Sequence, residues 1–482
     1  MDRASIGEHG MVSTLLVVID GLRATDVRKM PFLTELVHRG VSYRQARSVA
    51  PSLTRPAAAS LASGAPPGVT GIQGNRLWAD GHLIDTGRPD HLELLRSLRG
   101  DRLLPVPTLG EHLADHGRKL VAVGTGSNGC TLLLNPGAVD GHGAAIGARP
   151  FGHDAFYAQP ESVRRRLADS LPRAADGPFP ELDWATDLIV DYVIPELAPD
   201  VLVLWSGELD DVQHDNGVDG PAGDAALSEI DRRLRRLIDR VREQAPHTDV
   251  IVTADHGFSN ATHTVDVADI ESLIPPSLAD AVRLVDNNGG LLVYARRRLR
   301  TTQINAILDA IVSAGWSGPV FAEGDVPGVL PPAGLWSTRT AADGLLAYVS
   351  LTYHDRLGNP RIGHSVRDST RLAGGHGSTS AADMRIPLVL NGPSFRTAHE
   401  SSFPADHLDI PTTICRLMGL PVPPTMSGRV LSEAGLLGPG NAPALPEDRR
   451  VVAERGAADV TTAHFQHLAG RQYFLSADRH RS

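Results

Sequence analysis

Short runs of apolar and β-branched residues, each the length of a β-strand, alternate along this chain with amphipathic helical stretches. The strand-like runs cover residues 14–19, 119–124, 201–205 and 250–253, and the clearest helical stretches cover residues 108–116 and 224–244. Because strands that alternate with helices form βαβ units, the pattern predicts an α/β fold. We expect a mostly parallel central sheet with helices on both faces.

Polar residues of the kinds that bind ligands follow three of these runs. Asp20 comes directly after the first run, Asp210 lies a few residues after the third, and Asp255 and His256 close the fourth. In open α/β sheets, ligands bind beyond the carboxyl ends of the strands. We therefore expect these side chains to meet in one crevice at that edge of the sheet.

The composition is that of an ordinary globular protein, with 482 residues, 41% hydrophobic residues and a formal net charge of -10. The negative charge argues against a nucleic-acid-binding surface, although bound metal ions could still attract a small anion. No apolar run is long enough to cross a bilayer, and no signal-peptide pattern precedes the first strand. We therefore expect a cytoplasmic protein without membrane contact, whose oligomeric state the sequence leaves open.

The two cysteines, Cys130 and Cys415, lie far apart and form no Cys-x-x-Cys motif. Two isolated cysteines in a chain of this length are more often small buried residues than a disulfide. A thiolate zinc site is therefore not expected.

Five short motifs carry the candidate chemistry, and each also has a simpler explanation. An aspartate that ends a strand is usually a turn or helix cap, and the spacing of Asp210 and His214 often occurs by chance, although a helix places both on one face. The glycines beside His256 and His376 would let the chain turn sharply or approach a metal. Taken together and in chain order, the motifs are more specific than any one of them. They contain Asp20, Thr54, Asp210 with His214, Asp255 with His256, and His376.

In order and spacing these motifs resemble the alkaline-phosphatase superfamily, most closely its nucleotide pyrophosphatase/phosphodiesterase branch. The resemblance covers residues 15–431, with gaps within 259–373, and implies an alkaline-phosphatase-like fold. It also implies two divalent metal ions, expected to be Zn²⁺, although manganese or iron would suit the same ligands. One ion would be held by Asp210, His214 and His376, and the other by Asp20, Asp255, His256 and Thr54.

The resemblance assigns Thr54 as the nucleophile and Asn75, twenty-one residues later, as a donor to a non-bridging phosphate oxygen. Two metal ions can hold the attacking and leaving oxygens of an in-line displacement, which would pass through a phospho-threonine. The residues around Thr54 are shaped like a sulfatase motif. Threonine stands where the sulfatase cysteine would be, and it cannot become formylglycine, so that route to sulfate-ester cleavage is excluded.

The expected substrate is a small-molecule phosphodiester or pyrophosphate. A phosphonoacetate-type C–P hydrolase or a phosphomonoesterase of the same superfamily is an alternative. Such enzymes add lysines after the asparagine, whereas residues 120–148 contain neither Lys nor Arg. Arg55 is predicted to hold a second phosphate or carboxylate of the substrate, or else to supply the monoester cation. Trp205 would stack on a nucleobase or simply lie in the core.

An alternative of another class is a non-catalytic binding protein that has kept the fold. The catalytic domain is predicted to span residues 12–437, with an inserted cap region at 259–373 that looks less regular and is rich in Pro and Gly. Residues 438–482 would form a C-terminal extension whose basic end, 479–482, is expected to fray.

Overall fold

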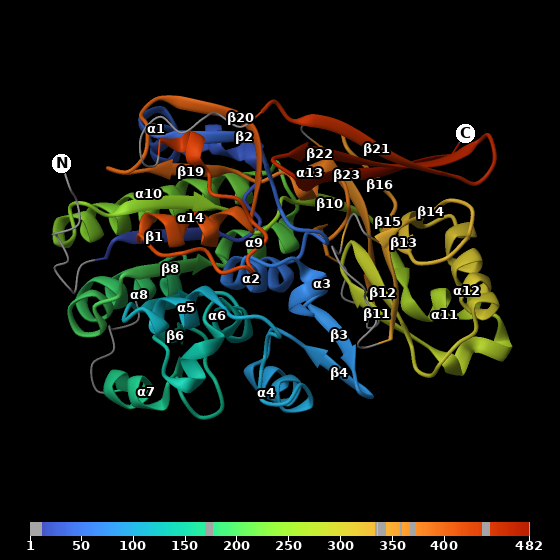
Figure 1. Cartoon of the computed structure of the whole chain (residues 1–482), viewed down its shortest axis with the longest axis horizontal. Helices are drawn as coiled ribbons and strands as arrows, with labels where there is room; N and C mark the ends of the chain where they lie inside the picture. Colours follow the sequence, from blue (N-terminus) through green and yellow to red (C-terminus); the bar gives the residue numbers. More distant parts are fainter. Residues whose placement is uncertain are drawn as a thin grey trace.

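The computed structural model describes residues 12–168, 177–332, 335, 344–356, 359–366, 372–435 and 444–481. Its centre is a nine-stranded sheet covered by helices on both faces (Figure 1). In order across the sheet the strands are β20 (His399–Asp406), β2 (Val41–Arg47), β19 (Leu388–Asn391), β9 (Asp249–Thr253), β1 (Thr14–Ile19), β8 (Val201–Ser206), β5 (Leu120–Gly124), β6 (Ala144–Gly147) and β7 (Tyr157–Gln159).

The middle of this sheet is parallel. Strands β9, β1, β8, β5 and β6 all run the same way, while β7 and β19 are antiparallel to their neighbours. Every residue of β1, β5, β8 and β9 is buried, as expected for strands with helices on both sides. The four strand-like runs correspond to these four strands, so the predicted mostly parallel sheet is confirmed.

The helices of the described residues fill the connections between the strands. They are α1 (Pro31–Arg39), α2 (Thr54–Ser63), α3 (Pro67–Thr70), α4 (Pro89–Leu98), α5 (Leu109–Asp115), α6 (Asn128–Leu134), α7 (Glu161–Ala168), α8 (Pro180–Leu188), α9 (Glu208–Asn216), α10 (Pro221–Gln244), α11 (Val267–Leu273), α12 (Thr301–Ser313), α13 (Ala381–Met384) and α14 (Asp409–Leu417).

Both predicted helical stretches are present. The α10 helix buries Leu227, Ile230 and Leu234 at helical spacing, which confirms its amphipathic pattern. The α5 helix begins with a capping box, in which the Thr108 hydroxyl accepts the Glu111 N–H and the Glu111 carboxylate accepts the Thr108 N–H.

Two smaller sheets, with strands between residues 259 and 375, lie where the sequence looked irregular. A five-stranded sheet has the order β11 (Val282–Asn287), β12 (Gly290–Ala295), β15 (Leu345–Leu351), β13 (Ser317–Ala322) and β14 (Val329–Leu330). A four-stranded sheet has the order β16 (Tyr353–His354), β17 (Arg361–Val366), β10 (Ser259–Asp266) and β18 (Gly374–Gly375). Ile270, Leu291, Ile307 and Val349 belong to a separate hydrophobic core here. The Pro and Gly residues therefore mark turns between regular elements.

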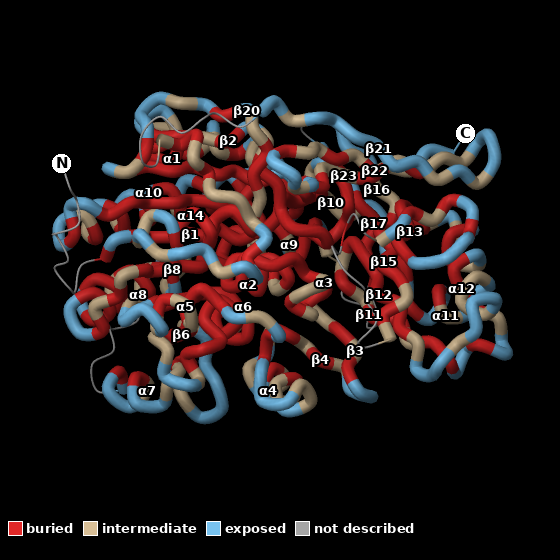
Figure 2. Tube along the Cα trace, in the orientation of Figure 1, coloured by how far each residue is buried: buried red, intermediate tan, exposed pale blue. Residues whose placement is uncertain are grey.

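The C-terminal residues form an antiparallel sheet of β21 (Glu447–Glu454), β22 (Asp459–Leu468) and β23 (Arg471–Arg481), alongside the five-stranded sheet (Figure 1). The outer strand β21 is exposed, whereas parts of β23 are buried (Figure 2). Arg479 lies in β23 and pairs with Asp459 at 2.5 Å. The expectation that this basic end frays is therefore wrong for residues 479–481, and residue 482 lies outside the described residues.

A short hairpin of β3 (Arg76–Ala79) and β4 (His82–Asp85) follows α3 and completes the strands of the fold. Cys130 and Cys415 are both buried, in agreement with their prediction as small core residues. Among the described residues, no helix is both long and apolar enough to cross a bilayer.

Candidate two-metal active site

Two groups of carboxylate and imidazole side chains lie beyond the carboxyl ends of β1, β8 and β9. The first group contains Asp210, His214 and His376, and the second contains Asp20, Asp255 and His256. In each group, one ligand atom from every residue lies within 4.8 Å of the others. The parallel register causes this convergence, because Val18 of β1 is paired with both Trp205 of β8 and Thr253 of β9.

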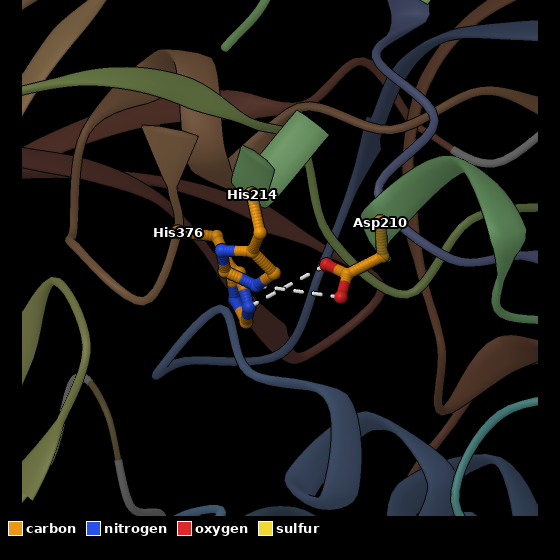
Figure 3. Close-up of side chains that lie close together, drawn as sticks. All are labelled: Asp210, His214 and His376. Carbon is orange, nitrogen blue, oxygen red and sulfur yellow. Dashed lines mark ion pairs between the residues drawn. The ribbon is translucent and has the colours of Figure 1, made fainter. Parts of the chain in front are cut away.

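The first group is built by one turn of helix and one loop. Asp210 and His214 are both in α9, four residues apart, and the Asp210 Oδ2 lies 3.3 Å from the His214 Nε2. His376 enters from the loop after β18, with its Nε2 3.7 Å from the other carboxylate oxygen of Asp210. Figure 3 shows both imidazoles directed toward the Asp210 carboxylate.

The predicted nucleophile, Thr54, lies beside the second group. The Nε2 of His256 lies 3.0 Å from Asp255 Oδ2 and 3.4 Å from Asp20 Oδ1. The Oγ1 of Thr54, at the first residue of α2, lies 3.3 Å from the same Nε2. Thr54 is only 4% exposed, so its hydroxyl faces this group rather than bulk solvent.

All three histidines are oriented in the same way. Their Nδ1 atoms contact backbone carbonyl oxygens, at 3.0 Å for His214 and Gly374, 2.9 Å for His256 and Gly257, and 3.1 Å for His376 and Ser52. Since a carbonyl only accepts, each Nδ1 must carry the proton, which leaves the Nε2 lone pair for a metal ion. This orientation is the usual one for histidine ligands in proteins.

Three carboxylate oxygens in these groups are buried without a hydrogen-bond partner, namely Asp20 Oδ1, Asp210 Oδ1 and Asp255 Oδ2. Leaving a buried carboxylate oxygen unsatisfied is costly, whereas a divalent cation would satisfy it. Together with three imidazole Nε2 atoms, these oxygens form donor sets that suit a divalent ion such as zinc. The residues present therefore fit two metal ions.

The electrostatics of the groups point the same way. Burial raises the pKa of Asp20 well above its ordinary value, and repulsion from Asp255 and Asp210 raises it further. Burial opposes the charge of His214, but the Asp210 carboxylate outweighs it and raises the pKa of His214 to about 9. The carboxylates of Asp20, Asp210 and Asp255 thus concentrate negative charge in these two groups, and either protons or metal ions must balance it.

Residues 14–314 match the sequence profile of the family described as type I phosphodiesterase / nucleotide pyrophosphatase. The chain belongs to this family. The predicted branch of the alkaline-phosphatase superfamily is thereby confirmed, and the protein is assigned to the phosphodiesterase and nucleotide pyrophosphatase class of hydrolases. No match is found among the curated proteins.

Solved structures of similar fold include mammalian ectonucleotide pyrophosphatase / phosphodiesterase 5. The murine protein is 17% identical to this chain with a TM-score of 0.60, and the match covers 86% of this chain and 96% of that one. The human protein is also 17% identical with a TM-score of 0.61, covering 88% and 98%. An inactive variant of the murine protein, solved in complex with AMP, is 17% identical with a TM-score of 0.62 and the same coverage of 88% and 98%. At this identity the likeness shows the fold.

The ring of Trp205 is not exposed, as the predicted stacking on a nucleobase would require. It is 1% exposed within β8, and its indole Nε1 donates to Asp20 Oδ2 at 3.0 Å. With no exposed ring face it cannot stack on a nucleobase, and the alternative of a core tryptophan holds instead.

The Asn75 side chain contacts the residue that follows Thr54. Its side-chain Oδ1 accepts the backbone N–H of Arg55 at 3.0 Å, one residue after Thr54. Its backbone carbonyl accepts from the N–H of Thr86 at 3.0 Å and from its hydroxyl at 2.7 Å. The carboxamide is therefore held at the first turn of α2.

The Arg55 guanidinium contacts Ser127 and Gly87. Its Nη2 donates to the Ser127 hydroxyl at 3.0 Å. The same atom packs closely on Gly87, where an added Cβ would lie 2.7 Å from it. Ser127 and Gly87 also line an open pocket of about 510 Å³. Arg55, the residue after Thr54, thus contacts two residues that line this pocket.

Sequence reasoning missed two residues of this pocket. Arg149 lies in its wall, one residue after the stretch 120–148 that lacks Lys and Arg, and pairs with Asp211 at 2.6 Å. Phe151, 37% exposed, is the aromatic side chain among the pocket residues. No local motif marks either residue, because the irregular loop of residues 148–156 brings them here.

Proposed function

We propose that this protein hydrolyses a phosphodiester or pyrophosphate-type bond with Thr54 as nucleophile and two divalent metal ions as cofactors. The observation that carries the proposal is the 3.3 Å contact between Thr54 Oγ1 and His256 Nε2 within the second acidic group. A buried hydroxyl beside a complete set of metal-binding side chains is the arrangement that activates a weak nucleophile.

Six side chains would hold the metal ions, with zinc as the expected metal. Asp210, His214 and His376 would bind one, and Asp20, Asp255 and His256 the other, with Thr54 completing the second set. When bound, two such ions lower the pKa of a hydroxyl ligand and neutralise charge on the phosphoryl group. The unsatisfied oxygens of Asp20, Asp210 and Asp255 support this assignment.

The protein's own groups then carry out the transfer. The Thr54 oxygen forms a bond to phosphorus while the bond from phosphorus to the leaving oxygen breaks, which gives a phospho-threonine. Water then attacks phosphorus, releases the Thr54 oxygen and yields the phosphate product. The Nδ2 of Asn75 would donate to a non-bridging oxygen, because its Oδ1 is already used by the Arg55 N–H.

The pocket beside Arg55 suggests what the substrate carries besides the reacting phosphate. Arg55 and Arg149 would favour a substituent with its own negative charge, and Phe151 would favour a planar group. The AMP complex of the murine relative supports a small, nucleotide-like phosphoester. We therefore assign Arg55 to a second phosphate or carboxylate of a diester or pyrophosphate substrate.

The experiment is a substrate comparison with protein that has been stripped of metal and reconstituted with zinc. We expect a higher kcat/KM for bis-p-nitrophenyl phosphate than for p-nitrophenyl phosphate, and no release of phosphate from phosphonoacetate. A clear preference for the monoester or for phosphonoacetate would favour the corresponding alternative. Tight metal binding without hydrolysis of any ester would instead indicate a binding protein that has kept the fold.

A further inference from the structure

The turn between β11 and β12 in the inserted region lies against two active-site segments at once. Asn287, at the end of β11, contacts the segment of Asn75, while Gly289 donates its N–H to the carbonyl of His376 at 2.7 Å. The carbonyl of Gly377 also accepts the hydroxyl of Tyr348 from β15. This turn and β15 therefore contact the backbone of two site segments, the one that holds Asn75 and the one that holds His376.

The contact of Asn287 with the Asn75 segment is a paired one. Asn287 Oδ1 accepts the Arg76 N–H at 3.0 Å, and Asn287 Nδ2 donates to the Arg76 carbonyl at 2.9 Å. One carboxamide thus satisfies both backbone groups of the residue that follows Asn75, as a neighbouring strand would. Asn287 is 3% exposed, so water cannot readily replace these bonds.

The packing around this pair is tight. A Cβ at Gly74 would lie 2.7 Å from Asn287 Oδ1 and 2.8 Å from Leu292 Cδ1. Gly74 is thus pressed against Asn287 on one side of Asn75, and Arg76 is bonded to Asn287 on the other. Since Thr86 holds the Asn75 carbonyl, the peptide of Asn75 has little freedom to rotate.

We propose that Asn287 is a positioning residue, which fixes the Asn75 carboxamide against the first turn of α2 by pairing with the backbone of Arg76. Asn287 does not touch the substrate. It acts through Asn75, whose Oδ1 must stay bonded to the Arg55 N–H for its Nδ2 to face the reacting phosphoryl group. The catalytic consequence rests on the proposed function, whereas the structural consequence does not.

The kinetic experiment is a double-mutant cycle with Asn75→Ala and Asn287→Ala on bis-p-nitrophenyl phosphate. We expect Asn75→Ala to lower kcat about 100-fold, as for other lost oxyanion donors, and Asn287→Ala to lower it about tenfold with little change in KM. In the Asn75→Ala background, the Asn287→Ala change should have no further effect. Equal losses in both backgrounds would overturn the proposal.

Asp286→Asn is the matched control. It removes the ion pair between Asp286 and Arg76, 2.9 Å long, which joins the same two segments beside the Asn287 pair. The Arg76 side chain is 40% exposed, so this ion pair contributes little, and we expect wild-type kcat. If Asn287→Ala does not fold, Asn287→Asp replaces it, because this isosteric side chain cannot donate to the Arg76 carbonyl and should also lower kcat.

A crystal structure of the Asn287 variant separates this proposal from the proposed function. The hydrogen bond from the Arg55 N–H to Asn75 Oδ1, 3.0 Å here, should be broken in the variant. If it persists unchanged, Asn287 does not position Asn75. A wild-type protein that hydrolyses no phosphoester would count against the proposed function, while this structural comparison would still decide the role of Asn287.

Discussion

The imidazole rings of His256 and His376 are stacked, with their centroids 3.5 Å apart and an angle of 10° between their planes. His256 belongs to one candidate metal-binding group and His376 to the other. The two groups are therefore in direct contact, and a change in either imidazole ring alters the packing of both groups. Burial, together with the neighbouring His256, holds the pKa of His376 well below its ordinary value, which keeps this ring neutral.

Substitution of a metal-binding residue should lower metal content and activity together. His376→Ala removes the third side chain of its group and the stacking partner of His256, and Asp255→Asn replaces an unsatisfied carboxylate oxygen. Zinc content by mass spectrometry should fall in both variants, in step with kcat/KM. Asp215→Asn, an exposed neighbour of His214 outside both groups, is the control. Full zinc content in both test variants would refute the ligand assignment.

Thr54→Ala should abolish turnover and leave zinc content close to wild type, because six aspartate and histidine ligands remain. Thr54→Ser is the control, since it keeps a hydroxyl beside His256 Nε2 and should retain measurable turnover. Turnover is followed with bis-p-nitrophenyl phosphate. A Thr54→Ala variant within about tenfold of wild type would not be missing its nucleophile.

Trp205→Phe should lower kcat/KM by the same factor for nucleotide diesters and for bis-p-nitrophenyl phosphate. The ring packing is largely kept, but Asp20 Oδ2 loses the indole donor at 3.0 Å, and that donor favours the charged carboxylate. We also expect weaker zinc binding, measured by competition with a chelating dye. A loss confined to nucleotides would show that the ring contacts the base after all.

Arg55→Ala should lower kcat/KM most for diesters whose second substituent is negatively charged, because the guanidinium contacts Ser127 and Gly87, which line the pocket. Comparing a nucleoside diphosphate ester with bis-p-nitrophenyl phosphate measures this difference. Arg165→Ala, an exposed arginine that pairs with Glu161 outside this pocket, is a suitable control. Should the wild type prefer monoesters and lose that preference in Arg55→Ala, Arg55 supplies the monoester cation.

Asp383→Asn should change the pH dependence of stability. Asp383 accepts hydrogen bonds from Ser259 and Ser378, close to His256 and His376, and burial raises its pKa to about 6. A raised carboxyl pKa favours folding while the group is protonated, and this contribution is lost as the pH rises from the ordinary value of 3.8 through about 6.

The asparagine variant stays neutral, so its free energy of unfolding relative to wild type should increase between about pH 4 and about pH 7. Urea unfolding of chelator-treated protein measures it without interference from bound metal. A difference that does not vary with pH would show that Asp383 titrates normally.

Most of the metal-binding groups could be predicted from the sequence, because each ligand lies just after a strand or at helical spacing. Asp20 and Asp255 follow β1 and β9 directly, and their convergence is a consequence of parallel pairing. Trp205 was harder to place, since nothing local distinguishes a strand-end tryptophan that faces the ligand from one that bonds to Asp20. Long-range pairing decides that question.

The two smaller sheets between residues 259 and 375 could not be predicted for a similar reason. Their strands are short and separated by Pro and Gly, so periodicity alone gave no sheet order. The pair Asn288-Gly289 between two apolar runs is a hairpin signal that would have identified β11 and β12. Even so, the contact of Asn287 with Arg76 joins residues more than two hundred positions apart and has no local signature.

The order of the strands in the sheet has a consequence for how this protein folds. Strand β2 leads into the segment of Thr54, yet its only neighbours in the nine-stranded sheet are β19 and β20, which begin at Leu388 and His399. During synthesis β1, β5, β8 and β9 can pair long before these residues leave the ribosome. We expect β2 to be fixed last among these strands, because closing so long a loop is slow. A chain that stops before residue 388 would thus contain all the candidate metal ligands, while the strand that leads to Thr54 would lack both of its partners in the sheet.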